Sequence, residues 1–402
     1  MIQTAVLGYG TVGSGVVEVI EKNKQEINKK SGEALNIKYI LDLRDFPGDP
    51  YEDKVVHDVE LILNDPEVKI ICETMGGIKP AYDFTKRALC LGKSVCTSNK
   101  ELVALHGPEL IQIAHEHQCN YLFEASVGGG IPIIRPLNYS LTAEKIDAIT
   151  GILNGTTNYI LTKMEREGAD FSEVLKEAQE KGYAERNPEA DVEGHDACRK
   201  IAILSSLMCC RNVKYEDIYT EGITKITPED FVYARSMGKT IKLLAQSKEV
   251  DGKMYAMVAP FLISLAHPLS MVNGVFNAVW VHGNMLGDSM YYGRGAGKLP
   301  TASAVVSDVV DCARHIGKVI MCFWDHEDVE LTGIEQASRR FFVRVPLEKE
   351  KEAMHIFERA SAVEADVPGE FAFVTDRMTE KEFNEKAQQT GIISRIRIEE
   401  QE

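Results

Sequence analysis

The chain has 402 residues and a formal net charge of −16 at pH 7. This length predicts two or three domains, each large enough for its own core. The negative charge disfavours nucleic acids and anionic membranes as partners, and the sequence lacks the roughly 18 continuous apolar residues of a membrane span. The nine cysteines show no CxxC spacing, so neither a zinc site nor a disulfide framework is predicted. A first strand starting at residue 2 or 3 leaves no room for a signal peptide, and we expect a cytoplasmic protein.

The N-terminus predicts a dinucleotide-binding turn. Residues 2–7 (IQTAVL) form a short β-type run that leads directly into the sequence GYGTVG at 8–13 and then into a helix to about residue 29. A G-x-G-x-x-G sequence between a strand and a helix is typical of a Rossmann turn. Gly8 permits the tight turn, Gly10 lets the backbone approach a pyrophosphate, and Gly13 permits close helix–strand packing.

The second predicted strand, at 36–43, leads into a short segment that contains both Asp42 and Arg44. An acidic residue at this place favours NAD because it binds the ribose 2′-hydroxyl, whereas an arginine favours NADP because it faces a 2′-phosphate. The residues leave both cofactors open, and we favour NADP because of Arg44.

An acidic loop runs into a helix between residues 180 and 200. The helix starts at about His195 and becomes almost entirely apolar after Lys200. Asp196 and Lys200 are four residues apart and therefore share one helix face. A partly desolvated lysine at that place becomes a usable proton donor and acceptor. The alternative is an ordinary solvated Asp–Lys pair, worth roughly 0.3–0.5 kcal/mol.

Two further segments are candidates for ligand contacts. Lys100 follows a predicted strand and starts a helix, at the sheet edge where α/β folds bind ligands. The glycine-rich sequence FEASVGGGIP at 123–132 leaves another strand. Glycines let such a turn curl its carbonyl groups inward, which suits a hard cation with oxygen ligands.

Several of these motifs resemble homoserine dehydrogenases. The resemblance rests on NGTTNYIL (154–161) and GYAERNPEADVEGHDACRK (182–200), and it continues in TSNKELVALHGPEL, EASVGGGIPIIRPL, HPLSMVNGVFNAV and YYGRGAGKLPTASAVVSD. Together these motifs cover most of residues 1–315. The resemblance implies an NADP- or NAD-dependent enzyme of threonine and methionine biosynthesis that interconverts L-homoserine and L-aspartate 4-semialdehyde.

The resemblance also implies roles for individual residues. The proton is handled by Lys200 or Lys100, with Asp196 beside them; which lysine carries it stays open. The expected substrate contacts are Glu185, Asp191, Asp196, Gly155, Thr156 and Tyr183. The expected cofactor contacts are Gly8, Gly10, Thr11, Val12, Gly13, Arg44, Met75, Gly76, Ser98, Lys100 and Gly297. A structural monovalent cation, taken as sodium, is expected at main-chain oxygens of Glu124, Val127, Gly129 and Ile131.

The expected fold class is α/β with three domains. A doubly wound Rossmann domain at 1–135 is completed by a helix at 301–319. An α+β domain at 136–300 binds substrate and forms a homodimer. The segment 338–402 predicts a β-α-β-β-α-β order, typical of a ferredoxin-like, ACT-like module, through which a tetramer would form. Its sequence VPLEKEKEAM replaces the D-x-P-G-V-L turn of amino-acid-binding ACT modules, so a regulatory and a packing role both stay open.

Two other functions compete with this interpretation. A phosphorylating aldehyde dehydrogenase needs an activated cysteine beside a histidine, and the nearby pair is His195 and Cys198. Cys198, however, lies two residues from Asp196 and is expected to point away from that face. A cofactor- or amino-acid-sensing regulator that has lost its chemistry predicts gaps among Lys100, Glu185, Asp196 and Lys200, and all four are present.

Overall fold

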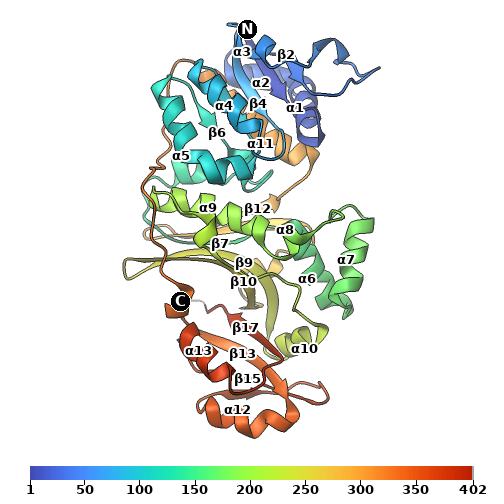
Figure 1. The fold of residues 1–402 in the computed structure, drawn as a ribbon, viewed down its shortest axis with the longest axis vertical. Helices are drawn as coiled ribbons and strands as arrows, with labels where there is room; N and C mark the ends of the chain where they lie inside the picture. The colour runs from blue at the N-terminus through green and yellow to red at the C-terminus, as the bar shows by residue number, and fades with distance from the viewer. Residues whose placement is uncertain (401–402) are drawn as a thin grey trace. The chain divides into compact units, whose positions relative to one another are not determined.

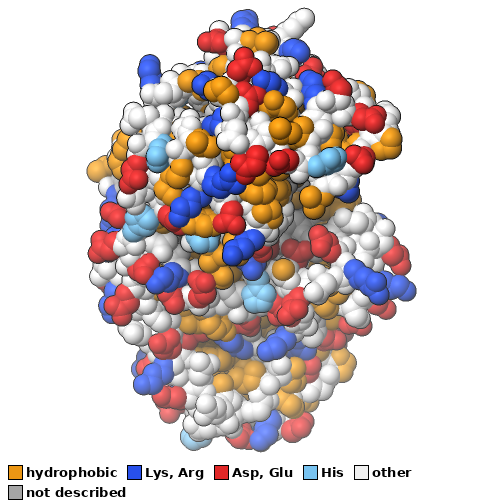
Figure 2. Space-filling view, turned by 45° about the horizontal axis from the view of Figure 1, so that its top comes forward, with side chains coloured by type: hydrophobic (Ala, Val, Ile, Leu, Met, Phe, Trp, Pro, Cys, Tyr) orange, Lys and Arg blue, Asp and Glu red, His pale blue; other side chains and the backbone are white. Residues whose placement is uncertain are grey.

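The computed structural model describes residues 1–400, which form two compact units. The first contains residues 1–145, 202–214 and 293–329, and the second contains residues 146–201, 215–292 and 330–400. Within residues 1–400, no helix is long and apolar enough to cross a bilayer. Figure 2 shows acidic and basic side chains interspersed over the visible face, and neither sign dominates it.

The first unit contains a six-stranded parallel sheet in the order β3-β2-β1-β4-β5-β6. This is the strand order of a doubly wound dinucleotide-binding fold, in which the direction of winding reverses between the first strand and its neighbour β4. The strands are β1 (Ile2–Leu7), β2 (Leu35–Leu41), β3 (Val55–Val56), β4 (Val68–Glu73), β5 (Ser94–Thr97) and β6 (Tyr121–Leu122). The ligand edge therefore lies where β1 and β4 end.

Helices cover the sheet of the first unit (Figure 1). They are α1 (Thr11–Lys22), α2 (Lys24–Ser31), α3 (Glu60–Leu63), α4 (Ala81–Cys90), α5 (Lys100–Glu116) and α11 (Lys298–Arg314). α11 comes from far along the chain and packs against α1. The approach is close at Gly15, where a Cβ atom would lie 2.8 Å from the Lys298 carbonyl oxygen. The core between these helices and the strands includes Val6, Val16 and Val305, all fully buried.

The second sheet has eleven strands in the order β12-β11-β7-β9-β10-β17-β13-β15-β14, with β8 beside β10 and β16 beside β13. Most of its strand pairs are antiparallel, whereas β10 pairs in parallel with β8 and β17. The strands are β7 (Ile146–Ile152), β8 (Tyr219–Thr220), β9 (Lys239–Val250), β10 (Lys253–Ser264), β11 (Phe276–Gly283), β12 (Gly287–Arg294), β13 (Ser338–Pro346), β14 (Ser361–Val363), β15 (Glu370–Val374), β16 (Met378–Thr379) and β17 (Ser394–Ile398).

The helices of the second unit are α6 (Gly155–Glu167), α7 (Phe171–Glu180), α8 (Glu189–Val192), α10 (Pro228–Ser236), α12 (Glu350–Ile356) and α13 (Glu380–Ala387). The helix α9 (His195–Cys209) begins in this unit, and its residues from 202 on belong to the first. α6 begins directly after β7, so the turn between them lies at the end of a central strand. α8 and α9 follow one another in the acidic loop region. The β7–α6 turn carries Asn154, α8 carries Asp191, and α9 carries Asp196 and Lys200.

The C-terminal segment has the predicted β-α-β-β-α-β order, with the short β16 as an addition. Its strands are arranged as β17-β13-β15-β14 with antiparallel neighbours. The last strand, β17, also pairs with β10, so that Phe261 is opposite Arg397 and Leu262 is opposite Ile398. The strands of this segment therefore continue the sheet of the middle segment, and both segments lie in one compact unit.

Local structure departs from the sequence-based expectations in two helices and two strands. The helix expected from 11 to about 29 is two helices, because the chain turns at Asn23. The long strand β9 and the edge strand β12 were not predicted. The predicted helix at 301–319 begins earlier and ends at Arg314.

Candidate active site

The glycines of the predicted Rossmann turn have geometries that fit a bound pyrophosphate. Gly8 has φ +90°, which glycine adopts without strain. A Cβ atom at Gly13 would lie 1.9 Å from the Gly8 carbonyl oxygen, so only glycine allows this close packing. At Gly10 a Cβ atom would meet no atom within 4 Å, so the space beside this backbone is open at the N-terminus of α1. Thr11 and Val12 form the first residues of that helix, where backbone N–H groups favour anions.

Asp42 and Arg44, the two residues that argue for different cofactors, bind each other. Nε of Arg44 lies 3.0 Å from Oδ1 of Asp42, and Nη2 lies 3.1 Å from Oδ2. The Asp42 carboxylate also accepts the backbone N–H of Tyr9, in the glycine-rich turn, at 2.8 Å. Hydrogen bonding from the Arg44 guanidinium holds the pKa of Asp42 well below its usual range. The Arg44 side chain is 63% exposed, so it remains available to a ligand.

Glu73, at the end of β4, is a buried carboxyl group that sequence reasoning missed. The hydroxyl of Thr97 donates to Oε2 at 2.5 Å, and the backbone N–H of Met75 donates to Oε1 at 2.8 Å. Burial raises the pKa of Glu73 to about 7. Through these two hydrogen bonds, Glu73 links the predicted cofactor segment after β4 to the end of β5, where the second such segment begins.

Lys100 is the first residue of α5. The preceding residue, Asn99, is the N-cap, and its Oδ1 accepts the backbone N–H of Leu102 at 3.1 Å. The other end of the Asn99 side chain donates to the Gly77 carbonyl oxygen at 2.6 Å. The segment after β4, which contains Met75 and Gly76, is therefore tied to the start of the Lys100 helix.

Lys200 and Asp196 form a buried ion pair on the first turns of α9. Nζ of Lys200 lies 2.7 Å from Oδ2 of Asp196 and donates to the Leu153 carbonyl oxygen at 2.8 Å. Lys200 is 8% exposed and Asp196 is 3% exposed. This burial excludes the ordinary solvated pair that the sequence left open. A buried lysine held by a carboxylate and a carbonyl can donate a proton as the ammonium, or accept one as the neutral amine, at a fixed place.

Asn154 joins the acidic residues to this pair. Its Nδ2 lies 2.7 Å from Oδ1 of Asp191 and 2.9 Å from Oδ2 of Asp196. Its Oδ1 accepts the backbone N–H of Thr157 at 2.9 Å, as the N-cap of α6. The structure thus brings together Asp191, Asp196 and Lys200, which the sequence singled out, around Asn154, which it did not. The Asn in the motif NGTTN was a signal for this residue, since asparagine is a preferred N-cap.

Gly155 and Thr156 follow Asn154 directly in the chain, and Tyr183 lies on the loop that Thr156 contacts. The Thr156 hydroxyl donates to the Tyr183 carbonyl oxygen at 2.6 Å, and a Cβ atom at Gly155 would lie 2.9 Å from the Val275 carbonyl oxygen. The Tyr183 side chain is 44% exposed. Glu185 lies on the same loop and is also exposed, and its carbonyl oxygen accepts the side-chain amide of Gln179 at 3.1 Å.

The glycine-rich turn at 123–132 is tightly closed by backbone groups. The Glu124 carboxylate accepts the backbone N–H groups of Ile133, Ile134 and Arg135 at 2.6, 2.9 and 2.8 Å. A Cβ atom at Gly128 would lie 2.5 Å from the Ile131 carbonyl oxygen, and one at Gly129 would lie 2.3 Å from the Gly295 carbonyl oxygen. Within residues 1–400, no group of three or more His, Cys, Asp or Glu side chains could hold a metal ion.

Gly297, the last predicted cofactor residue, is the N-cap of α11 and has φ +121°. The first residue of this helix, Lys298, binds Glu18 of α1 at 2.9 Å. Ion pairing with Lys22 and Lys298 lowers the pKa of Glu18 to about 2. The start of α11 is thus fixed to the helix that follows the Rossmann turn.

Cys198 lacks the surroundings of an activated nucleophile. Its Sγ donates to the Tyr215 carbonyl oxygen at 3.3 Å, and burial raises the pKa of its thiol. A catalytic cysteine needs the opposite shift. The geometry therefore argues against the phosphorylating aldehyde dehydrogenase.

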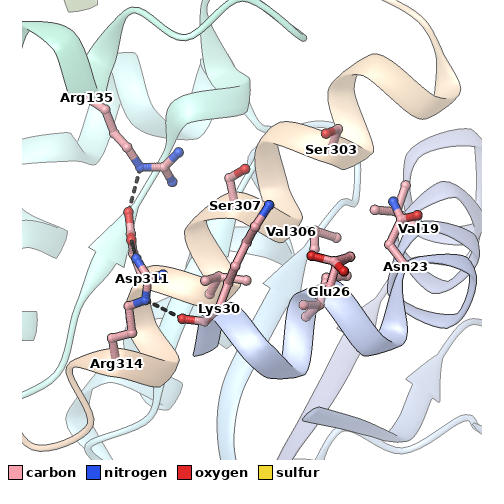
Figure 3. Close-up of a pocket in the computed structure, with 12 residues that line it drawn as sticks. Val19, Asn23, Glu26, Lys30, Arg135, Ser303, Val306, Ser307, Asp311 and Arg314 are labelled. Atoms are coloured by element: carbon pink, nitrogen blue, oxygen red, sulfur yellow. Dashed lines mark hydrogen bonds and ion pairs between the residues drawn. The ribbon is translucent and has the colours of Figure 1, made fainter. Parts of the chain in front are cut away.

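A cavity of about 490 Å³ lies in the first unit (Figure 3). α1, α2 and α11 form its walls together with Arg135, and its lining includes none of the predicted site residues among residues 1–400. Two of its charged side chains already have partners: Nε of Arg135 lies 2.6 Å from Asp311, and Arg314 donates to the Lys30 carbonyl oxygen at 2.6 Å. The cavity is therefore not the candidate active site.

Comparisons with known proteins agree on one family. A family model for homoserine dehydrogenase matches residues 132–310, and a model for its NAD binding domain matches residues 8–124. The homoserine dehydrogenase of Synechocystis is 43% identical over 359 residues, which cover 85% of this chain and 82% of that protein. That of Bacillus subtilis is 43% identical, with 77% of this chain and 72% of that protein covered.

Solved structures give the same result. A homoserine dehydrogenase from Thiobacillus denitrificans matches with a TM-score of 0.90 and 34% identity, over 99% of this chain and 98% of that chain. A hyperthermophilic archaeal homoserine dehydrogenase, solved in complex with NADPH, matches with a TM-score of 0.66 and 28% identity, over 77% of this chain and 97% of that chain. The sequence, the glycine-rich turn and these matches show that the chain belongs to the homoserine dehydrogenase family, which comprises nicotinamide-dependent oxidoreductases.

Proposed function

We propose that this homoserine dehydrogenase interconverts L-homoserine and L-aspartate 4-semialdehyde, as a step in threonine and methionine biosynthesis, with Lys200 moving the hydroxyl proton. The nicotinamide cofactor supplies the hydride chemistry, which leaves the protein to orient the substrate and to manage one proton. The observation that carries the proposal is the buried Lys200 ammonium, held 2.7 Å from Asp196 and 2.8 Å from the Leu153 carbonyl oxygen. Lys100, at the ligand edge of the Rossmann sheet, is the second candidate for this role.

We place the substrate beside the Asn154 cluster. Asp191 and Asp196 bring carboxylates to the same place as Lys200, which suits a substrate that carries both an ammonium and a hydroxyl group. Glu185, Gly155, Thr156 and Tyr183 are the proposed neighbouring contacts.

The residues of the first unit fit a dinucleotide. Gly8, Gly10 and Gly13, with Thr11 and Val12, would hold its pyrophosphate at the start of α1. The segments with Met75, Gly76 and Ser98, the Lys100 helix and the Gly297 loop would hold the remainder. NADP is the proposed cofactor because Arg44 is exposed and can accept a 2′-phosphate, whereas NAD is the alternative that Asp42 favours.

A monovalent cation, proposed as sodium, would be held by main-chain oxygens of Glu124, Val127, Gly129 and Ile131. Its support is the tight closure of carbonyl groups around Gly128 and Gly129. The Glu124 carboxylate itself is occupied by three backbone N–H groups. We assign this cation a structural role and no part in proton transfer.

We further propose that the enzyme is cytoplasmic and forms a homodimer, or a tetramer through the C-terminal segment. The antiparallel β17-β13-β15-β14 arrangement supports an ACT-like module. Its missing D-x-P-G-V-L turn supports a packing role for the module.

Oxidation of NADPH and of NADH in the presence of aspartate 4-semialdehyde tests the proposed reaction. We expect turnover that does not require inorganic phosphate. Oxidation of the aldehyde that requires both phosphate and NADP would instead indicate the phosphorylating aldehyde dehydrogenase. Cofactor binding without any turnover would indicate a regulator that has lost its chemistry.

A further inference from the structure

The β7–α6 turn holds both members of the Lys200–Asp196 pair through two consecutive residues. The carbonyl oxygen of Leu153 accepts Nζ of Lys200, and the side chain of Asn154 donates to Asp196. Oδ2 of Asp196 is therefore shared between Nζ of Lys200 and Nδ2 of Asn154. Leu153 and Asn154 are 2% and 6% exposed, so the whole arrangement is shielded from water.

The partners of Asn154 fix the orientation of its amide. Its Oδ1 faces the backbone N–H of Thr157, which can only donate, so the amide nitrogen must face the opposite way. On that side lie the two carboxylates, which can accept both hydrogens of the amide. A flipped amide would place its oxygen against two carboxylate oxygens and its nitrogen against an N–H group, and both contacts are repulsive.

The hydrogen bonds from the Asn154 amide to Asp191 and Asp196 reduce the repulsion between the two carboxylates. Asp191 of α8, which is half-buried, and Asp196 at the start of α9, which is buried, both bring carboxylates to the amide of Asn154, and like charges at close range repel. A neutral donor that bonds to both carboxylates reduces this repulsion without adding a second cation beside Lys200. It also links α8 and α9 to the end of β7, a central strand of the sheet.

We infer that Asn154 is a positioning residue, which aligns Asp191 and Asp196 so that Asp196 holds Lys200 in place for the substrate proton. The inference rests on the proposed role of Lys200. Asn154 need not touch the substrate, since it acts through the two carboxylates. Its second task, capping α6, is separable, because the cap uses Oδ1 and the carboxylates use Nδ2.

Two substitutions separate these tasks. Asn154→Ser keeps a good N-cap and loses the amide donor, whereas Asn154→Ala loses both. If Asn154 is a positioning residue, both variants lower kcat for homoserine oxidation by a similar factor of about 10–100. Only Asn154→Ala is expected to lower the Tm clearly, and the Kd of the cofactor stays unchanged in both. An Asn154→Ser enzyme with wild-type kcat and KM would reduce Asn154 to a helix cap and overturn the inference.

A double-mutant cycle with Asp196→Asn tests the route of the effect. Because Asn154 acts through Asp196, adding Asn154→Ser to Asp196→Asn should lower kcat by less than about threefold further. Fully multiplicative effects would contradict the inference. Thr379→Ala, which removes the N-cap of α13, is the matched control, with an expected loss of stability and unchanged kcat.

Measuring Lys200→Ala alongside Asn154→Ser tests the proposed role of Lys200 separately from the proposed role of Asn154. If Lys200→Ala is impaired while Asn154→Ser is not, the role of Asn154 is wrong and that of Lys200 stands. If Lys200→Ala matches the wild type, the proposed function of Lys200 is wrong, whatever Asn154→Ser does.

Discussion

The guanidinium of Arg44 forms two hydrogen bonds to the carboxylate of Asp42, at 3.0 and 3.1 Å. The two residues that argue for different cofactors are therefore coupled. Binding of a 2′-phosphate requires Arg44 to turn toward the ligand or to share its hydrogen bonds with Asp42. Asp42 thus offsets part of the preference for NADP that Arg44 provides.

Replacing Arg44 with Ala should raise the KM for NADP far more than the KM for NAD. The change removes a charge-assisted phosphate contact worth roughly 1.5–3 kcal/mol, which corresponds to about 10–150-fold. Asp42→Asn is the complementary variant, because it frees Arg44 and should lower the KM for NADP. Steady-state kinetics with both cofactors measure these effects. Parallel changes in the two KM values would show that Arg44 does not contact the 2′-phosphate.

The buried carboxyl group of Glu73 should make stability depend on pH. Burial raises the pKa of Glu73 to about 7 in the folded protein from its ordinary value of 4.5, so folding favours its protonated form. The stabilisation is complete below about pH 4.5 and is lost as the pH rises through 7, with a total on the order of 3 kcal/mol. Glu73→Gln cannot titrate and should lack this decline. Free energies of unfolding between pH 5 and 8 measure the difference. Glu116→Gln, on the exposed surface of α5, is the control, and an unchanged pH dependence in Glu73→Gln would contradict the account.

The buried guanidinium of Arg397 should contribute strongly to the stability of the second unit. Arg397 is 1% exposed and binds Glu380 at 2.6 Å and Glu221 at 2.7 Å. Arg397→Met leaves two carboxylates without this cation and should lower the free energy of unfolding by about 3–5 kcal/mol. Arg359→Met is the matched control, because Arg359 forms an exposed pair with Asp376 at 3.7 Å, worth at most about 1 kcal/mol. Urea denaturation of the two variants makes the comparison, and similar losses in both would refute the prediction.

Truncation after residue 336 should separate cofactor binding from turnover. The first unit contains no residue beyond 329 and should still bind its cofactor. The second unit loses β17, the neighbour of β10, and should be destabilised. Isothermal titration with NADPH and activity assays test both statements. Threonine should leave the full-length enzyme active, since the D-x-P-G-V-L turn is missing, and millimolar inhibition that disappears on truncation would contradict this.

Local sequence signals predicted the first unit well. A strand, a G-x-G-x-x-G turn and a helix are contiguous in the chain, and each strand of the parallel sheet has its own short apolar run. The hairpin of β9 and β10 also had a local signal, because its turn is Asp251-Gly252, with φ +51° and +74°. An Asp-Gly pair with positive φ is typical of a two-residue hairpin. β9 was nevertheless not predicted.

The features that the sequence did not predict depend on contacts between residues distant in sequence. The partners of Asn154 lie 37 and 42 residues away, and β17 pairs with β10 across more than a hundred positions. Glu73 ends an ordinary apolar strand, and its burial depends on how β4 and β5 pack together. The spacing of Asp196 and Lys200 predicted that they share a helix face. Their burial could not be predicted, because it depends on packing against residues distant in sequence, such as Leu153.

Measuring kcat for Lys200→Ala across pH tests most directly whether Lys200 moves the substrate proton. The account predicts a loss in kcat of roughly 10²–10⁴-fold, the usual contribution of a positioned acid or base, with an unchanged Kd for the cofactor. A Lys200→Ala enzyme within about threefold of the wild type at every pH would contradict the claim and leave Lys100 as the remaining candidate.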